Sequence, residues 1–128
     1  MDAATVAALV EIAEDARARA RQQDPGATRA VEDSYPEMRE ALDWCLASGR
    51  PETAYRLASA LVPFWVSTNR MDDGDGWFER ALGTMAGSES SRARALYDHG
   101  YLVLWPGRYD VARQRFSEAL ALAAGLGD

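Results

Sequence analysis

The sequence predicts an all-α protein built from antiparallel helical hairpins that stack as a short α-solenoid, and three observations support this. Alanine supplies 24 of the 128 residues and Ile12 is the only isoleucine, so residue preferences favour helix over strand along the chain. Apolar side chains recur at steps of three and four residues in the long segments. A similar set of residues returns after 38 positions, which is typical of a repeat architecture.

Local signals place the helices of the first half. A first helix is predicted from about residue 3 to residue 21. Asp24 is predicted to cap a short second helix that ends near residue 33, with Pro25 at its first position. The spacing Ser34-x-x-Glu37 is that of a capping box, so a third helix is expected to begin there. Gly49 is expected to end it in the left-handed conformation.

The remaining helices follow from prolines, glycines and acidic residues. Pro51 begins a helix that Pro63 bends and Asn69 closes. Aspartates open the next helix, another runs from about 91 to 104, and the last one is predicted to end at the glycines of 125–127. We therefore expect a single helical-repeat domain over 1–128, with N-terminal helices at 1–33, degenerate helical repeats at 34–86 and a clearer repeat at 91–124.

The repeat has an offset of 38 residues. Asn69-Arg70-Met71-Asp72 superposes on Gly107-Arg108-Tyr109-Asp110, and Phe78, Ala81 and Leu82 superpose on Phe116, Ala119 and Leu120. Each copy reads as a helix, a short turn and a second helix. Gly100 and Ala112 fall where the two helices would cross closely, with Phe116 filling the space beside that contact.

These residues resemble a known repeat family. Leu96, Gly100, the Gly107-x-Tyr109 turn, Ala112, Phe116 and Ala119 look like one tetratricopeptide repeat, although Ala124 stands where the family's closing proline is usual. In the earlier copy, Val62 and Gly74 occupy the places of Gly100 and Ala112. The run from about Asp24 to Asp128 is similar to the solenoid segment of large actinobacterial regulators, which join an ATPase module to a DNA-binding domain of the LuxR or antibiotic-regulator type. The arginine-only, alanine-rich composition suits such a source.

The resemblance implies a binding groove. In tetratricopeptide proteins one face of each first helix lines a concave surface, and here that face carries Arg94, Tyr97, Tyr101 and Trp105. The counterparts one repeat earlier are Arg56, Ser59 and Pro63, followed by Ser67. Aromatic rings beside an arginine are typical of binding anchors. The alternative is that a neighbouring helix covers these side chains.

Composition excludes several kinds of site. All 14 basic residues are arginine, so no lysine is present for a phosphate loop, a Schiff base or a general base. A single cysteine and a single histidine cannot form an internal disulfide or a zinc cluster. The net charge of −6 argues against direct binding of nucleic acid or an anionic membrane. We therefore expect no catalytic residues, no metal and no cofactor.

The pattern of apolar residues matches neither a signal peptide nor a membrane span. Asp2 is acidic where a signal peptide is positive, and Glu11 ends the first apolar run. The longest apolar stretch, 57–66, is about half the length that a bilayer span needs. With a lone cysteine, this predicts a cytoplasmic protein without membrane contact.

Four features of the sequence suggest a functional site but are better explained by helix capping, packing or solvent exposure. The segment Asp72-Asp73-Gly74-Asp75-Gly76 fails as a calcium loop, because Met71 and Arg80 would fall on ligand positions, so its aspartates are expected to cap a helix. His99 and Cys45 each share the apolar stripe of their helix, which predicts a hydrogen-bonded packing histidine and a small buried hydrophobe. Arg17, Arg19 and Arg21 are expected on a solvated face. Of the tryptophans, Trp65 and Trp77 are expected in the core, and Trp44 and Trp105 at the surface.

The sequence therefore favours a non-catalytic module that binds a protein or peptide, related to a bacterial transcriptional or signalling regulator. An alternative is a helical domain that senses a small effector, and a weaker one is an enzyme of unknown class. The last helix carries apolar residues on more than one face, namely Val111, Phe116, Leu120, Leu122 and Ala123. This pattern predicts that another copy of the chain, or a following segment, covers it, for example in a homodimer through the C-terminal helix.

Overall fold

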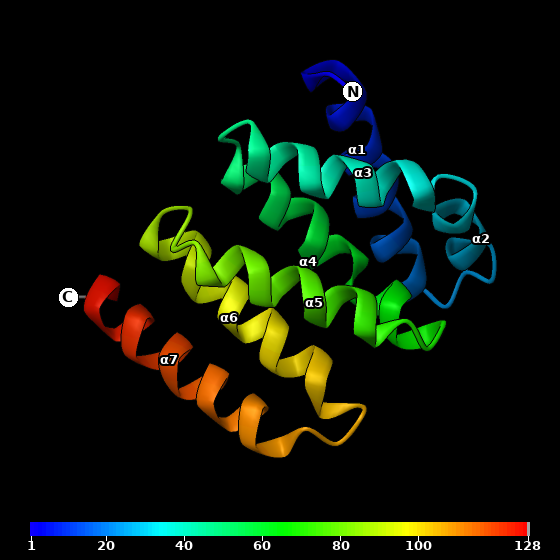
Figure 1. The fold of residues 1–128 in the computed structure, drawn as a ribbon. Coiled ribbons are helices and arrows are strands. Elements are labelled where there is room, and N and C mark those ends of the chain that lie inside the picture. The colour runs from blue at the N-terminus through cyan, green and yellow to red at the C-terminus, as the bar shows by residue number, and fades with distance from the viewer. Residues whose placement is uncertain (128) are drawn as a thin grey trace. The chain divides into compact units, whose positions relative to one another are not determined.

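The computed structural model describes residues 1–127, and the all-α prediction is confirmed for them (Figure 1). The helices are α1 (Ala3–Arg21), α2 (Ala27–Glu32), α3 (Tyr35–Ala47), α4 (Pro51–Ser67), α5 (Met71–Gly83), α6 (Glu89–Leu104) and α7 (Tyr109–Gly127). The chain divides into two compact units, Met1–Thr68 and Asn69–Asp128. None of the described helices is both long and apolar enough to span a bilayer. Asp128, the last residue of the predicted domain, lies outside the described residues.

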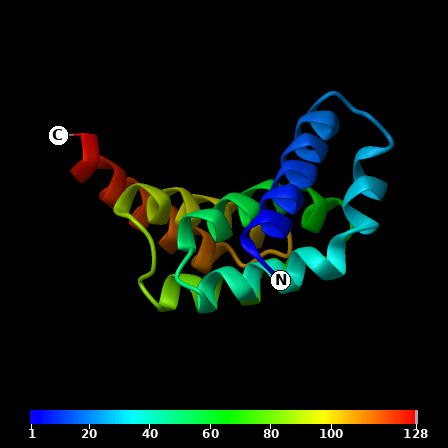
Figure 2. The same ribbon diagram turned by 90° about the horizontal axis from the view of Figure 1, so that it is seen from above.

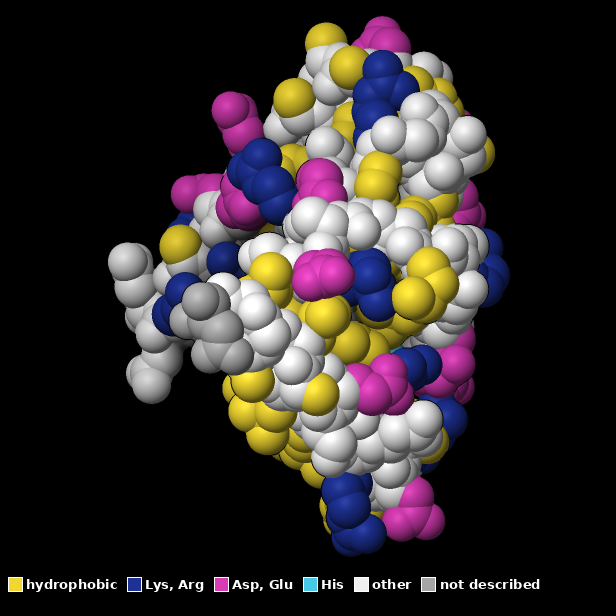
Figure 3. Space-filling model, turned by 90° about the vertical axis from the view of Figure 1, so that its left-hand side faces the viewer, with side chains coloured by type: hydrophobic (Ala, Val, Ile, Leu, Met, Phe, Trp, Pro, Cys, Tyr) yellow, Lys and Arg dark blue, Asp and Glu magenta, His cyan; other side chains and the backbone are white. Residues whose placement is uncertain are grey.

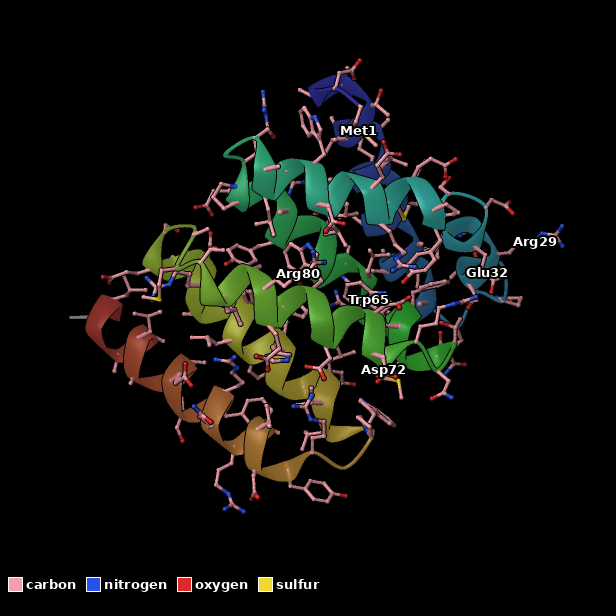
Figure 4. The ribbon with its side chains drawn as sticks, in the orientation of Figure 1. Met1, Arg29, Glu32, Trp65, Asp72 and Arg80 are labelled. Carbon is pink, nitrogen blue, oxygen red and sulfur yellow. The ribbon has the colours of Figure 1, made fainter. Side chains whose placement is uncertain are left out.

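In the first unit, α1 packs along α4 and also contacts α2 and α3. Figure 2 shows α1 in dark blue and the loop that leads from it to α2. The side of α1 that is buried carries small and branched residues: Val6, Leu9, Val10, Ala13 and Ala16. Trp65 of α4 is buried as predicted, and its indole Nε1–H donates to the Tyr35 hydroxyl at 2.7 Å, which ties α4 to α3. On α2, Arg29 points away from this core into solvent (Figure 4).

Two predicted caps in the first unit do not form. The helix α2 begins at Ala27, two residues after Pro25, with Gly26 as its N-cap. The Asp24 carboxylate instead accepts hydrogen bonds from the Gly26 amide and from Arg19 Nε, both at 2.8 Å, so it stabilises the turn before the helix. Ser34 is the N-cap of α3, but its side chain makes no capping bond. Its backbone (φ −120°, ψ 8°) lacks the extended conformation that aims a hydroxyl at the first turn.

In the second unit, α6 packs against both α5 and α7, and α6 and α7 run side by side (Figure 1). The predicted close crossing at Gly100 is confirmed. A Cβ atom on Gly100 would lie 2.9 Å from Phe116 Cε1 and 3.2 Å from the Ala112 carbonyl oxygen. Trp77 and Phe78 of α5 are buried, as Trp77 was predicted to be. Trp105 is exposed as expected, whereas Trp44 is half-buried, with the Arg50 guanidinium 4.7 Å above its ring.

Two helix boundaries in the second unit differ from the sequence-based expectations, whereas the aspartates of 72–76 lie at the start of α5 as expected, with Asp72 and Asp73 in its first turn. The helix α6 begins at Glu89, two residues early, because the Ser88 hydroxyl accepts a capping bond from the Ser91 amide at 3.1 Å. The helix α7 continues through Gly125 to Gly127. Gly125 keeps a negative φ, and a single glycine lowers helix stability by only about 1 kcal/mol relative to alanine.

Helix boundaries recur with the 38-residue offset found in the sequence. The helices α4 and α6 begin at Pro51 and Glu89, and α5 and α7 begin at Met71 and Tyr109. The left-handed residues that precede them recur with the same offset. Gly49 and Gly87 have φ of +74° and +94°, and Asn69 and Gly107 have φ of +57° and +87°. The two copies therefore share helix starts and a left-handed residue two positions before each start.

Candidate functional site

The helix α6 presents a row of large side chains to solvent, here called the α6 outer face: Arg94, Tyr97, Tyr101 and Trp105. Their steps of three and four residues place them on one side of the helix. Tyr97 is 50% exposed, Tyr101 39% and Trp105 57%. Such large aromatic groups at the surface are candidates for partner contacts, because their burial on binding would remove a large apolar area from water.

The side chains of the α6 outer face are held by one another. Arg94 Nε donates to Asp98 Oδ1 at 3.1 Å, and the Arg94 guanidinium lies 5.9 Å from the Tyr97 ring centroid. Tyr101 and Trp105 form an edge-to-face pair with centroids 6.2 Å apart. Asp98 is buried, so its carboxylate holds the Arg94 guanidinium in a defined position. Ordering before binding reduces the entropy that a partner must offset.

An apolar groove of about 470 Å³ lies beside the α6 outer face, between α6 and α7. Its lining is almost entirely apolar: Ala93, Arg94, Tyr97, Phe116, Ala119, Leu120 and Ala123. Tyr97 and Phe116 form one wall, with ring centroids 5.6 Å apart. Leu120 on the other side is 73% exposed. Figure 3 shows hydrophobic side chains in yellow, gathered in patches between charged groups on one face of the molecule.

The predicted groove residues on α4 have different surroundings, because α1 lies along them. The carboxylate of Glu14 on α1 pairs with Arg56 through Nη2–Oε1 and Nε–Oε2 distances of 2.7 and 3.3 Å. Arg17, predicted on a solvated face, donates from Nη1 to the Ser59 hydroxyl at 3.2 Å. Pro63 lines a pocket of about 330 Å³ that α1 and α2 form over α4. In the first unit the predicted groove face is therefore in contact with a helix.

A polar cluster in the second unit surrounds His99, which has no solvent exposure. Its Nε2 lies 2.7 Å from Asp75 Oδ1 of α5, and its Nδ1 accepts a hydrogen bond from Arg115 Nε of α7 at 3.0 Å. Arg108 pairs with the other oxygen of Asp75. The imidazole also stacks on Phe78, with centroids 5.6 Å apart. His99 thus joins α5, α6 and α7, which confirms the prediction of a hydrogen-bonded packing histidine.

The hydrogen-bond pattern determines the protonation of His99. Because Arg115 can only donate, Nδ1 must be the acceptor, and the ring proton lies on Nε2 facing Asp75. Burial, followed by the positive charge of Arg115, lowers the pKa of His99 to about 4, while Glu79 and Glu118 act in the opposite direction. The side chain is therefore neutral at physiological pH.

Asp75, Glu79 and His99 bring three potential metal ligands within 4.8 Å of one another. Their surroundings do not fit a metal site. A metal on Nε2 would leave the imidazole proton on Nδ1, where it would face the N–H of Arg115. Arg108 also neutralises Asp75, and Arg115 Nη2 lies 3.6 Å from Glu79 Oε2. The arrangement is that of a structural network in which arginines occupy the place of a cation.

The single cysteine and the single histidine of the chain are both sequestered. Cys45 is fully buried in α3, and burial raises the pKa of its thiol, which favours the unreactive protonated form. Both ring nitrogens of His99 are engaged by Asp75 and Arg115. His99 therefore has no nitrogen left to activate a nucleophile.

The partners of His99 could not be found from the sequence. Asp75 precedes His99 by 24 residues, and no local spacing links them or Arg115. The repeat gives no signal either, since Leu61 stands at the position equivalent to His99 and Arg113 at the position equivalent to Asp75. Only the packing of three helices brings these groups together.

Comparisons with protein-family models, with curated proteins and with solved structures found no match to this chain.

Proposed function

We propose that this chain is a non-catalytic interaction module of the tetratricopeptide type that binds a protein or peptide at the α6 outer face and the adjoining groove. The observation that carries the proposal is the exposed row of Tyr97, Tyr101 and Trp105 beside Arg94. Aromatic and arginine side chains are the residue types that contribute most at interfaces. The sequestered states of His99 and Cys45 support a function without catalysis.

The solenoid part of the proposal is supported by the repeated helix starts and left-handed residues. Consecutive hairpins whose helices begin at the same repeat positions are expected to stack in a similar way. The resemblance to actinobacterial regulators, together with the net charge of −6, supports a cytoplasmic signalling role in which other parts of a regulator contact DNA.

A second candidate is the binding of a small effector. The groove between α6 and α7, at about 470 Å³, lies within the size range of small-molecule sites, and its lining is apolar. An effector would contact Tyr97 and Phe116 at the wall of this groove. Screening metabolites by thermal shift would reveal such a ligand, whereas a protein partner would be recovered by pull-down.

Replacing an exposed ring tests the proposed site. Tyr101→Ala should weaken binding of any recovered partner by about tenfold or more, since a buried aromatic anchor contributes more than 1 kcal/mol. The melting temperature should fall less than it would for a fully buried ring, because Tyr101 is 39% exposed. Tyr109→Ala is the matched control, because Tyr109 is also exposed but belongs to α7 and does not line the groove. Equal binding by parent and Tyr101→Ala would reject this site.

A further inference from the structure

A pocket of about 330 Å³ in the first unit lies between α1, α2 and α4. The loop that joins α1 to α2, seen in Figure 2, contributes Gln23 and Asp24 to its wall. The volume is at the lower end of the range for small-molecule sites, about 300–1,000 Å³, which are mostly apolar with a few polar groups. Most of the wall is apolar, with side chains that include Ala16, Ala20, Val31, Ala60, Pro63 and Phe64.

The cation in the wall of this pocket is Arg17 of α1, which is half-buried. Within residues 1–127, its only hydrogen bond is the one that Nη1 donates to the Ser59 hydroxyl at 3.2 Å, and no carboxylate pairs with it. This bond holds the guanidinium beside α4 and leaves its other N–H groups for a ligand. A cation that is partly removed from water without an anion gains from binding one.

The carboxylates of this region are already paired with other groups. Asp24, in the pocket wall, accepts hydrogen bonds from Arg19 Nε and from the Gly26 amide, both at 2.8 Å. Glu14 of α1 pairs with Arg56 at 2.7 Å. Among the described side chains of the wall, the uncompensated charge is therefore positive, and a cationic ligand would find no free carboxylate there.

We infer that this pocket binds a small monocarboxylate with an apolar body. The carboxylate pairs with Arg17, whose planar guanidinium matches it in geometry, and the body lies against the apolar wall. An apolar cavity of about 150 Å³ holds one benzene molecule, so a pocket of about 330 Å³ accommodates a ring with a short side chain or a branched aliphatic chain. The site is separate from the α6 outer face, so this inference goes beyond the proposed function and does not rest on it.

The probes are phenylacetate, hydrocinnamate and isocaproate, each compared with its neutral primary amide. They are titrated into the isotope-labelled intact chain, and binding is followed by the backbone amide NMR signals. We expect saturable shifts at pocket residues such as Ala16, Ala20 and Ala60. At least one acid should bind about tenfold more tightly than its amide, because only the acid forms a charged hydrogen bond with Arg17.

Replacing the cation tests the recognition of charge. Arg17→Gln should lower the affinity for the acid to that for the amide and should leave binding of the amide unchanged. Arg21→Gln is the matched control, because Arg21 is an exposed arginine of the same helix that does not line the pocket. Its preference for the acid should equal that of the parent chain.

Filling the pocket tests its location. Ala20→Leu should weaken binding of acid and amide alike by about tenfold or more, because the larger side chain occupies the space of the ligand. Ala20 is exposed and leucine is a good helix former, so the melting temperature should be close to that of the parent. Ala18→Leu, at an exposed position of α1 outside the pocket, is the control and should bind normally.

Three results would overturn the inference. The first is the absence of saturable shifts with every acid, and the second is equal affinity for each acid and its amide. The third is a set of shifts confined to the groove of Tyr97 and Leu120, which would support the second candidate function at that groove instead.

Discussion

At the scale of single residues, the second unit is organised around two positions that tolerate little change. His99 is fully buried between Asp75 and Arg115, and its neutral form is fixed by the donors and acceptors on either side. Gly100, the next residue, lies against Phe116 and the Ala112 carbonyl. Both positions face neighbouring helices, so their chemistry stabilises the fold that presents the α6 outer face.

The buried imidazole gives a pH-dependent stability. Its pKa is lowered to about 4 in the folded state from 6.5, so the unfolded chain binds the proton more readily. The stabilisation is complete above pH 6.5 and is lost as the pH falls from 6.5 towards 4, by about 3 kcal/mol in total. Because His99 is the only histidine, its NMR ring signals are unambiguous, and they should show the Nε2–H tautomer down to about pH 4. A titration midpoint near 6.5 in the folded protein would contradict this.

Substitutions at Gly100 test the helix crossing. Helix propensity alone would favour alanine there, but its Cβ would lie 2.9 Å from Phe116 Cε1. We expect Gly100→Ala to lower the free energy of unfolding by about 1–3 kcal/mol and Gly100→Leu to lower it further. Gly76→Ala is the matched control, since nothing lies within 4 Å of its Cβ, and it should stabilise the helix by about 0.5–1 kcal/mol. Urea denaturation measures all three, and equal effects of alanine at both glycines would refute the crossing.

At the scale of the helices, capping depends on backbone conformation more than on the motif. Ser34 belongs to a Ser-x-x-Glu sequence, yet its side chain does not cap α3. Ser88 precedes α6 with an extended backbone (φ −68°, ψ 162°), and its hydroxyl does accept the Ser91 amide. The start of α6, and with it the position of the α6 outer face, is therefore fixed more firmly than the start of α3.

This contrast gives a paired prediction. Ser88→Ala should lower the free energy of unfolding by about 1 kcal/mol, because a helix donor loses its acceptor. Ser34→Ala should change it by only a few tenths of that, since no capping bond is lost. Chemical denaturation of both variants under one set of conditions makes the comparison. A larger loss for Ser34→Ala would show that the capping box forms in solution.

At the scale of the whole molecule, equivalent residues of the two copies differ in how deeply they are buried. Phe78 and Leu82 of α5 are buried, and Phe78 stacks on His99 of α6. Their counterparts on α7 are the half-buried Phe116 and the largely exposed Leu120. An apolar helix face that is buried in one copy and exposed in the other is expected to be covered by a further helix.

We expect this chain, taken alone, to self-associate through α7. Light scattering over a dilution series should show a mass above 14.0 kDa at high concentration. Leu120→Glu should return the chain to a monomer, because a buried carboxylate would oppose the contact. Tyr109→Ser, also at an exposed position of α7, should leave the association unchanged. A 14.0 kDa monomer at every concentration, without binding of a hydrophobic dye, would refute the prediction.

The sequence by itself determined the helical class, most helix boundaries, the close approach at Gly100 and the row of side chains on α6. These depend on local preference and periodicity, which are properties of short segments. Only the tertiary structure decided which of these faces are covered. The contact of α1 with Arg56 and Ser59 joins residues 42 positions apart, and the His99 network joins three helices. Burial depends on which helices pack together. The repeat pattern in the sequence predicts the two helices and the turn of each hairpin, but it does not predict which other helices pack against that hairpin.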